Sequence, residues 1–252
     1  MRPWARLAML GIMITAVAAC AGPEAELARQ DSAQAHYDIG LGALAENNLT
    51  KAISELQIAV QEDPTNARYH HGLGNAYLRN QQFDEAIVSL RRAGELNPRL
   101  SDAFNDLGVA YMQREKWDLA IDAFRKALAN PRYLNPERAY VNLGNVYFIR
   151  GQYVQAAEEF RRLLDLYPQS SDGHFFLGRT HLSQGRFPEA QEQIEQAIKL
   201  DGTVPLFHLE LGIVLMRTGR RTEARDSFRR ALELNLAAPD AEQARRYLRE
   251  LN

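Results

Sequence analysis

The chain is poor in cysteine, with Cys20 as its single thiol among 252 residues. One thiol cannot form a disulfide within the chain, and a zinc site built from several cysteines is excluded as well. Basic charge is not in excess either, because 30 Lys and Arg stand against 32 Asp and Glu, a formal net charge of −2. Since nucleic-acid binders normally present a basic stripe, we expect no nucleic-acid partner.

The sequence also lacks the short motifs that carry much of enzyme chemistry. It has no Gly-rich phosphate loop, no H-E-x-x-H and no G-x-S-x-G. His70 and His71 are adjacent, so on a helix they point about 100° apart, whereas metal chelation favours an i, i+4 pair. We therefore expect a protein that is not an enzyme, with no catalytic residues, metal, cofactor or small-molecule substrate.

Long apolar runs are missing from all but the first 20 residues. Arg2 and Arg6 precede an apolar run over residues 7–19, in which Thr15 is the only polar side chain. The run is shorter than the roughly 20 apolar residues that span a bilayer comfortably. Its basic start and its small residues at the end are typical of a cleaved signal peptide, which we assign to residues 1–19.

The end of this run, Val17-Ala18-Ala19-Cys20, resembles the lipobox of bacterial lipoproteins. The resemblance implies that Cys20 is acylated and becomes the first residue of the mature chain, and that residues 20–32 form a lipidated tether. More than one acyl chain makes a durable membrane anchor. Ala21 replaces the aspartate typical of inner-membrane retention, which implies a lipid-anchored protein on the periplasmic side of the outer membrane.

Periodicity is what the sequence has in abundance. Six glycines recur at intervals of 34, 34, 36, 34 and 34 residues, and an alanine follows each glycine by twelve residues. Small side chains let two antiparallel helices approach closely, so we predict that these residues form the packing contacts of six helix pairs. The pairs are Gly40 and Ala52, Gly74 and Ala86, Gly108 and Ala120, Gly144 and Ala156, Gly178 and Ala190, and Gly212 and Ala224.

The units resemble the tetratricopeptide repeat, shown best by Leu143, Gly144, Tyr147, Ala156 and Phe160 of the fourth. The resemblance implies an all-α fold, a right-handed superhelical solenoid of six tetratricopeptide helix pairs plus a C-terminal capping helix. The predicted repeats are 33–66, 67–100, 101–136, 137–170, 171–204 and 205–238, followed by the capping helix at 239–252.

Three details depart from an even array. The third unit has two extra residues in a loop at 130–136, and His181 takes a tyrosine position in the fifth unit. Histidines replace the leading aromatic residue in four units, and for His70 we expect a packing role. Asp240 is predicted to cap the last helix. The replaced positions are His36, His70, His174 and His208.

In tetratricopeptide arrays the first helix of each pair lines a concave face through repeat positions 2, 5, 9, 12 and 13. The resemblance places mostly apolar residues there, and such a groove suits an amphipathic helix or an extended apolar segment of a partner. Tyr37, Leu41 and Leu44 are expected to contribute most. The same positions include Arg138, Ile149, Asp172 and Arg217. The predicted groove comprises Tyr37, Leu41, Leu44, His71, Asn75, Leu78, Val109, Met112, Val141, Asn145, Phe148, Phe175, Arg179 and Leu182.

Taken together, the lipobox, the six repeats and the long third-unit loop resemble the pilotins of type IV pilus biogenesis, the PilF/PilW type. The resemblance implies an outer-membrane lipoprotein that binds subunits of the secretin, promotes their localisation and multimerisation, and so supports pilus biogenesis and twitching motility. The alternative is a repeat lipoprotein that serves as an adaptor for cell-wall enzymes or for outer-membrane protein assembly.

Overall fold

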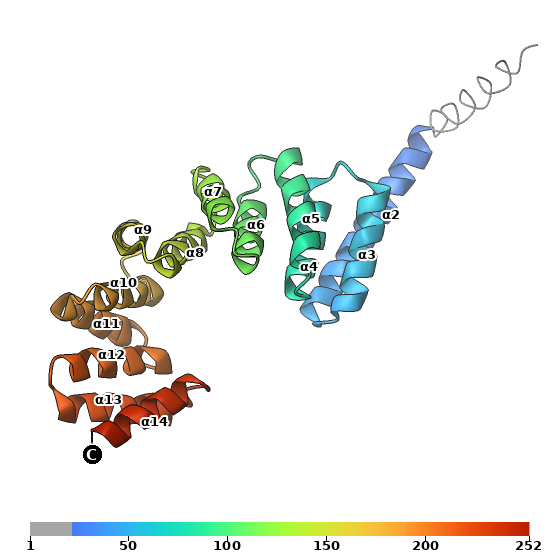
Figure 1. Ribbon diagram of the computed structural model, residues 1–252. Coiled ribbons are helices and arrows are strands. Elements are labelled where there is room, and N and C mark those ends of the chain that lie inside the picture. The colour runs from blue at the N-terminus through green and yellow to red at the C-terminus, as the bar shows by residue number, and fades with distance from the viewer. Residues whose placement is uncertain (1–21, 252) are drawn as a thin grey trace, which may run out of the picture. The chain divides into compact units, whose positions relative to one another are not determined.

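The computed structural model describes residues 22–251, and every regular element in this range is an α-helix (Figure 1). The predicted signal peptide and Cys20 lie outside the described residues. Within the described range, no helix combines the length and the hydrophobicity that crossing a bilayer requires. The chain divides into two compact units, Met1–Asp106 and Leu107–Asn252.

The helices form antiparallel pairs, which confirms the predicted tetratricopeptide fold. Second helices follow first helices after short turns, so each pair buries one apolar stripe of each helix. The first helices are α2 (Pro23–Ala45), α4 (Ala67–Arg79), α6 (Ser101–Gln113), α8 (Pro136–Ile149), α10 (Ser171–Ser183) and α12 (Pro205–Arg217). The second helices are α3 (Leu49–Glu62), α5 (Phe83–Leu96), α7 (Trp117–Leu128), α9 (Tyr153–Leu166), α11 (Phe187–Leu200) and α13 (Arg221–Glu233), and α14 (Asp240–Glu250) ends the array.

Close contact within each pair depends on the periodic small residues. A Cβ atom added at Gly144 would lie 2.4 Å from Cε1 of Phe160, and one added at Gly108 would lie 2.5 Å from Cε1 of Phe124. The alanines that follow by twelve residues are completely buried in all six pairs. The glycine thus leaves room for a large side chain of the second helix, which fills the space between the helices.

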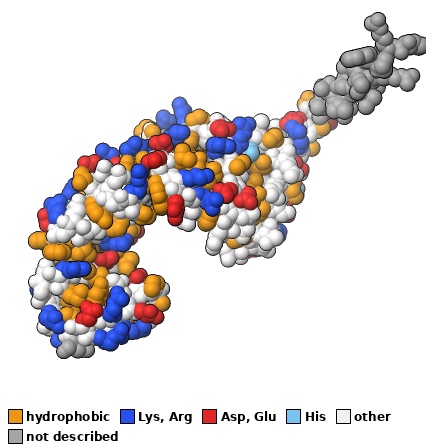
Figure 2. Space-filling model, in the orientation of Figure 1, with side chains coloured by type: hydrophobic (Ala, Val, Ile, Leu, Met, Phe, Trp, Pro, Cys, Tyr) orange, Lys and Arg blue, Asp and Glu red, His pale blue; other side chains and the backbone are white. Residues whose placement is uncertain are grey.

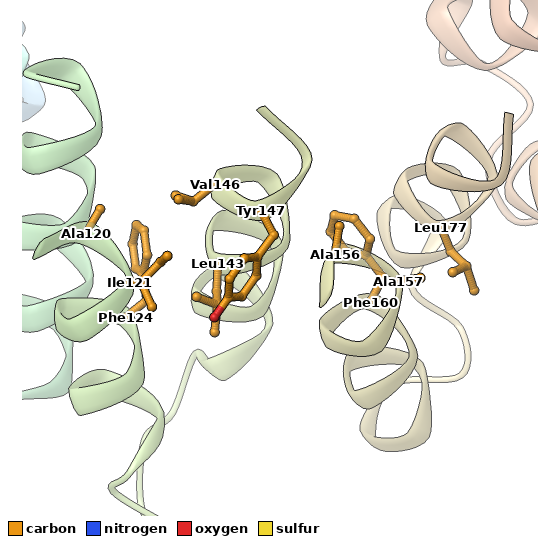
Figure 3. Close-up of a cluster of buried hydrophobic side chains, with 10 residues drawn as sticks. All are labelled: Ala120, Ile121, Phe124, Leu143, Val146, Tyr147, Ala156, Ala157, Phe160 and Leu177. Carbon is orange, nitrogen blue, oxygen red and sulfur yellow. The ribbon is translucent and has the colours of Figure 1, made fainter. Parts of the chain in front are cut away.

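The interior of the second unit is continuous from one pair to the next. Figure 3 shows the cluster in which Phe124, Leu143 and Phe160 are almost fully buried and draw on helices α7, α8 and α9. Phe160 also stacks on Phe176 of α10, with ring centroids 5.6 Å apart. In this unit each helix pair shown in the cluster therefore completes its core by packing against its neighbour, as expected of a solenoid.

Three of the four histidines at the leading aromatic position close the turn between repeats. The Nε2–H of each ring donates to a backbone carbonyl six residues earlier in the chain. For His70, this bond adds a polar function to the predicted packing role. The pairs are His70 with Pro64 at 3.0 Å, His174 with Pro168 at 3.2 Å and His208 with Gly202 at 3.0 Å.

The first helix begins earlier than the repeat pattern predicts. Helix α2 starts at Pro23, ten residues before the predicted repeat, so the described part of the predicted tether is helical. Pro23 occupies the first turn, where a missing N–H costs nothing, and Glu24 and Glu26 favour the positive end of the helix dipole. Most side chains before Ala33 are exposed. A helix with no buried face needs no apolar stripe, and the sequence has none in this stretch.

The last helix packs as predicted, but its capping residue is different. Pro239 occupies the N-cap of α14 and Asp240 is the first helical residue, with no side-chain cap. Ala241 and Ala244 are buried, and Tyr247 stacks on Phe228 with ring centroids 5.2 Å apart. Helix α14 thus covers the apolar end of the sixth pair.

Candidate partner-binding site

The first helices form the inner side of the second unit. Helix α8 contacts α10, α10 contacts α12, and α12 contacts α14, whereas no two second helices among α7, α9, α11 and α13 contact each other. The first helices are therefore closer together than the second helices, and the unit curves towards them (Figure 1). Apolar side chains are visible among polar ones on this unit in Figure 2.

Three residues of the predicted groove belong to the interior, which corrects the prediction. Tyr37, Leu44 and Phe175 are only 7%, 6% and 2% exposed. The ring of Tyr37 packs on Tyr69 at a centroid distance of 4.9 Å, and Phe175 packs on Phe207 at 4.6 Å. Their apolar surface is buried against neighbouring parts of the protein, so Tyr37 and Leu44 cannot be the principal contacts for a partner. Leu41 remains exposed on α2.

The first-helix face of the first unit is more polar than predicted. Asp106 is nearly buried, and its Oδ2 lies 2.9 Å from Nε2 of His71 and accepts a bond from Asn75 at 3.3 Å. The amide of Asn105 donates to Oδ1 of the same carboxylate at 3.2 Å. Three side chains from α4 and α6 therefore surround one carboxylate, and beside them Leu78 is half-buried.

The corresponding face of the second unit is mainly apolar. Phe148 and Ile149 end α8, and Ile149 is 57% exposed to solvent. The remaining predicted residues of this unit apart from Phe175 are half-buried, so each presents part of its surface on the face. They are Val109, Met112, Val141, Asn145, Arg179 and Leu182, together with Ile213 and Met216 from α12.

Arg179 fixes the centre of this face. Its Nε lies 3.1 Å from Oε1 of Glu210 on α12, and its guanidinium carbon lies 5.2 Å from the ring centre of Phe148 on α8. Burial raises the pKa of the Glu210 carboxyl, and the charge of Arg179 offsets part of that rise. One arginine thus connects three successive first helices through an ion pair and an aromatic ring.

The same repeat positions carry the polar contact in both units. Asn75 and Arg179 are at position 9 of their repeats, and each bonds a carboxylate 31 residues later, Asp106 or Glu210. A polar residue at position 9 followed by an acid at position 6 of the next repeat is the sequence signal for this contact. The signal is not visible within one repeat, because its two residues belong to consecutive repeats.

The charges at the ends of the second unit's face are unpaired. Arg138 in the first turn of α8 and Arg217 at the end of α12 are exposed, and neither has an ion pair with a described residue. Asp172 is the one acid at the predicted lining positions of this unit. Burial raises the pKa of Asp172, and the nearby charges of Glu137 and Asp201 raise it further.

In the described part of the chain, no group of three or more His, Cys, Asp and Glu side chains is placed to hold a metal ion. His181 is the histidine whose surroundings are most unusual. It is 4% exposed at the position that tyrosine occupies in other repeats, and burial lowers its pKa. On the first-helix face, partly exposed apolar side chains surround Arg179, which Glu210 and Phe148 hold in place.

Acid is expected to destabilise the protein through His181. Because the folded-state pKa is lowered, the unfolded chain binds the proton more readily, and stability falls as pH decreases below the ordinary histidine value of 6.5. His181→Tyr restores the residue type of Tyr147 and should narrow the difference between melting temperatures at pH 7.5 and 5.5. Thermal unfolding by circular dichroism measures both proteins. An equal difference in the two would assign the acid sensitivity to other groups.

Comparison with known proteins adds to this geometry. No curated protein matches the chain. Among solved structures, PilF of Pseudomonas aeruginosa is 19% identical over 86% of this chain and 97% of its own, with a TM-score of 0.73. PilW, described as a widely conserved type IV pilus biogenesis factor, is 19% identical over 84% of this chain and 97% of its own, with a TM-score of 0.75.

MamA is 24% identical over 68% of this chain and 93% of its own, with a TM-score of 0.61. These similarities establish the fold. Profiles of the tetratricopeptide repeat match residues 24–67, 71–135 and 177–244, and a second such profile matches 135–202. The matches extend over most of the sequence and coincide with the helix pairs, so the chain belongs to the tetratricopeptide repeat family.

Proposed function

We propose that the protein is a lipid-anchored pilotin of the outer membrane, facing the periplasm, that binds secretin subunits of the type IV pilus and promotes their multimerisation. The observation that carries the proposal is the likeness to PilF and PilW over 86% and 84% of the chain, with 97% of each neighbour covered. The lipobox-like sequence that ends at Cys20 supports the proposed anchoring in the outer membrane. The role is one of binding, without catalysis.

The physical basis of such a role is protection combined with confinement. A secretin subunit that has not yet assembled exposes apolar surface, and the partly exposed apolar residues of α8, α10 and α12 can cover a segment of it. A lipid anchor holds this surface at the membrane where the ring forms. Confinement of both partners to one membrane raises their effective concentration, so assembly is favoured without any additional contact.

Cys20→Ser is expected to separate the protein from the membrane. Without the thiol there is no site for the acyl chains, so the variant should leave the outer-membrane fraction, and secretin multimers should become less abundant. Cell fractionation followed by immunoblotting measures both. Ala21→Ser is the matched control, because it adds a hydroxyl at the next position and leaves Cys20 intact. A Cys20→Ser protein that stays in the outer membrane would remove the lipid anchor from the proposal.

The identity of the partner is a separate question with its own measurement. Affinity capture of the full-length protein from detergent extracts, followed by mass spectrometry, is expected to recover the secretin. Recovery of cell-wall hydrolases, synthases or outer-membrane assembly proteins in its place would support the adaptor role and exclude the pilotin role. The Cys20→Ser variant serves as a control for partners that bind through the lipid.

A further inference from the structure

The inner face of repeats four to six has a row of apolar side chains at the carboxyl ends of its first helices, and the repeats themselves leave this row partly exposed. Ile149 is 57% exposed, and Phe148, Leu182 and Met216 keep part of their surface accessible. They come from helices that contact each other, since α8 contacts α10 and α10 contacts α12. Methionine and aromatic residues are enriched at protein interfaces, and a continuous surface of this kind fits a protein segment.

Each end of this face carries one unpaired arginine. Arg138 lies in the first turn of α8 and Arg217 ends α12. Consecutive helices alternate in direction along the array, so α8 and α12 run in the same direction and the two arginines lie at opposite edges, two repeats apart. Both are exposed and form no ion pair with a described residue, whereas Arg179 forms an ion pair with Glu210.

The acids near this face leave its charge pattern intact. Glu210 is committed to Arg179, at 3.1 Å. Asp172 is exposed in the first turn of α10, where its nearby charges are those of Glu137 and Asp201, and it forms no ion pair with Arg138. Arg138 and Arg217 are therefore available to acidic side chains of a partner.

We infer that this face binds an apolar segment of the secretin subunit that carries acidic side chains at both of its ends. The apolar part of the segment covers Phe148, Ile149 and Leu182, and the acidic ends pair with Arg138 and Arg217. The inference rests on the proposed function for the identity of the partner. Charge complementarity at the edges sets the position of the segment across the repeats, in either chain direction, and steers its approach.

The test uses the full-length lipidated protein in detergent micelles and the purified, unassembled secretin subunit as the probe. The double variant Arg138→Glu and Arg217→Glu should weaken binding about tenfold, since two exposed pairs become like-charge contacts. Arg161→Glu with Lys199→Glu is the matched control, because both residues are exposed on second helices and have no ion pair with a described residue. The control should bind like the wild type.

The apolar row has its own pair of variants. Ile149→Ser should weaken binding several-fold, whereas Val88→Ser, which changes a side chain 60% exposed on the second helix α5, should leave binding unchanged. Overlapping secretin peptides bound by the wild type should be apolar with Asp or Glu at both ends. Binding of the arginine double variant at wild-type strength would overturn the inference while the pilotin role stands.

Two further outcomes also decide the matter. A wild-type protein that does not bind the secretin subunit at all removes the proposed function and this inference together. If the double variant keeps its affinity for secretin but no longer self-associates in size-exclusion chromatography, the face binds a second copy of the chain and the inference is wrong. Circular dichroism of every variant verifies that the repeats remain folded.

Discussion

Phe160→Ala should lower the free energy of unfolding by about 3–5 kcal/mol, the usual cost of truncating a fully buried phenylalanine. Phe160 has no exposed surface, fills the space beside Gly144, and stacks on Phe176 of the next pair. Truncation leaves a cavity between α8 and α9 and also removes a contact with α10. Because repeats stabilise each other through their interfaces, the loss extends beyond the fourth pair.

Urea denaturation followed by circular dichroism measures the effect of Phe160→Ala. Phe160→Leu is the control, since it retains most of the buried apolar volume and should cost about 1 kcal/mol. The transition of Phe160→Ala should also broaden if the second unit loses cooperativity. A loss below 1 kcal/mol would mean that neighbouring repeats collapse into the cavity and that the contacts of Phe160 are replaceable.

Gly144→Val is expected to destabilise the fold by about 3 kcal/mol through overpacking. A Cβ atom at this position would lie 2.4 Å from Cε1 and 2.6 Å from Cζ of Phe160, closer than non-bonded carbon atoms can approach. The ring cannot turn aside, because Phe160 is enclosed on all sides. Valine adds two methyl groups to the same space, so the pair must separate.

The control for Gly144→Val is a glycine in open surroundings. Gly42 lies in α2 and has no atom within 4 Å of an added Cβ, so Gly42→Ala should stabilise the helix, by up to about 1 kcal/mol. Because the two substitutions should change the free energy of unfolding in opposite directions, the comparison separates the effect of helix propensity from that of packing. Combining Gly144→Val with Phe160→Leu should recover part of the loss, and a double variant no more stable than the additive sum would contradict the proposed clash.

Much of the fold could be predicted from the periodic small residues. The predicted repeats begin at 67, 101, 171 and 205, and α4, α6, α10 and α12 begin at those same residues. The prediction succeeds because glycine at a close helix contact, alanine on the facing helix and a turn after each helix describe the same geometry independently. The two-residue insertion likewise appears as the longer connection between α7 and α8, where Leu134 is 88% exposed.

The helical start of α2 could not be found by the same reasoning. Its first ten residues belong to no pair and have almost no buried side chain, so no apolar periodicity marks them. The sequence does contain a local signal for a helix start here, namely Pro23 followed by acidic residues and good helix formers. The interpretation of these residues as a tether was wrong, because an exposed helix and a flexible linker have the same polar composition.

The candidate site was the least predictable part. Repeat position indicates which residues point inward, but it does not indicate which of them the neighbouring repeat covers. Tyr37 and Phe175 are covered by Tyr69 and Phe207 of the following repeats, while Ile149 is not. Contacts such as that of Arg179 with Glu210 depend on how closely successive first helices approach, and this curvature follows from the packing of whole pairs.

The helical start of α2 has a consequence for rotational phase. Residues 23–32 extend the first repeat by about 15 Å at 1.5 Å per residue, without an intervening flexible joint. Because each residue of an α-helix rotates the chain by about 100°, one residue inserted in this stretch would turn the start of the helix at Pro23 by about 100° about the helix axis relative to the repeats. Seven inserted residues would add about 10 Å and change the angle by only about 20°. Insertions of different lengths within residues 23–32 would therefore change the length of this helix and the rotation about its axis independently of each other.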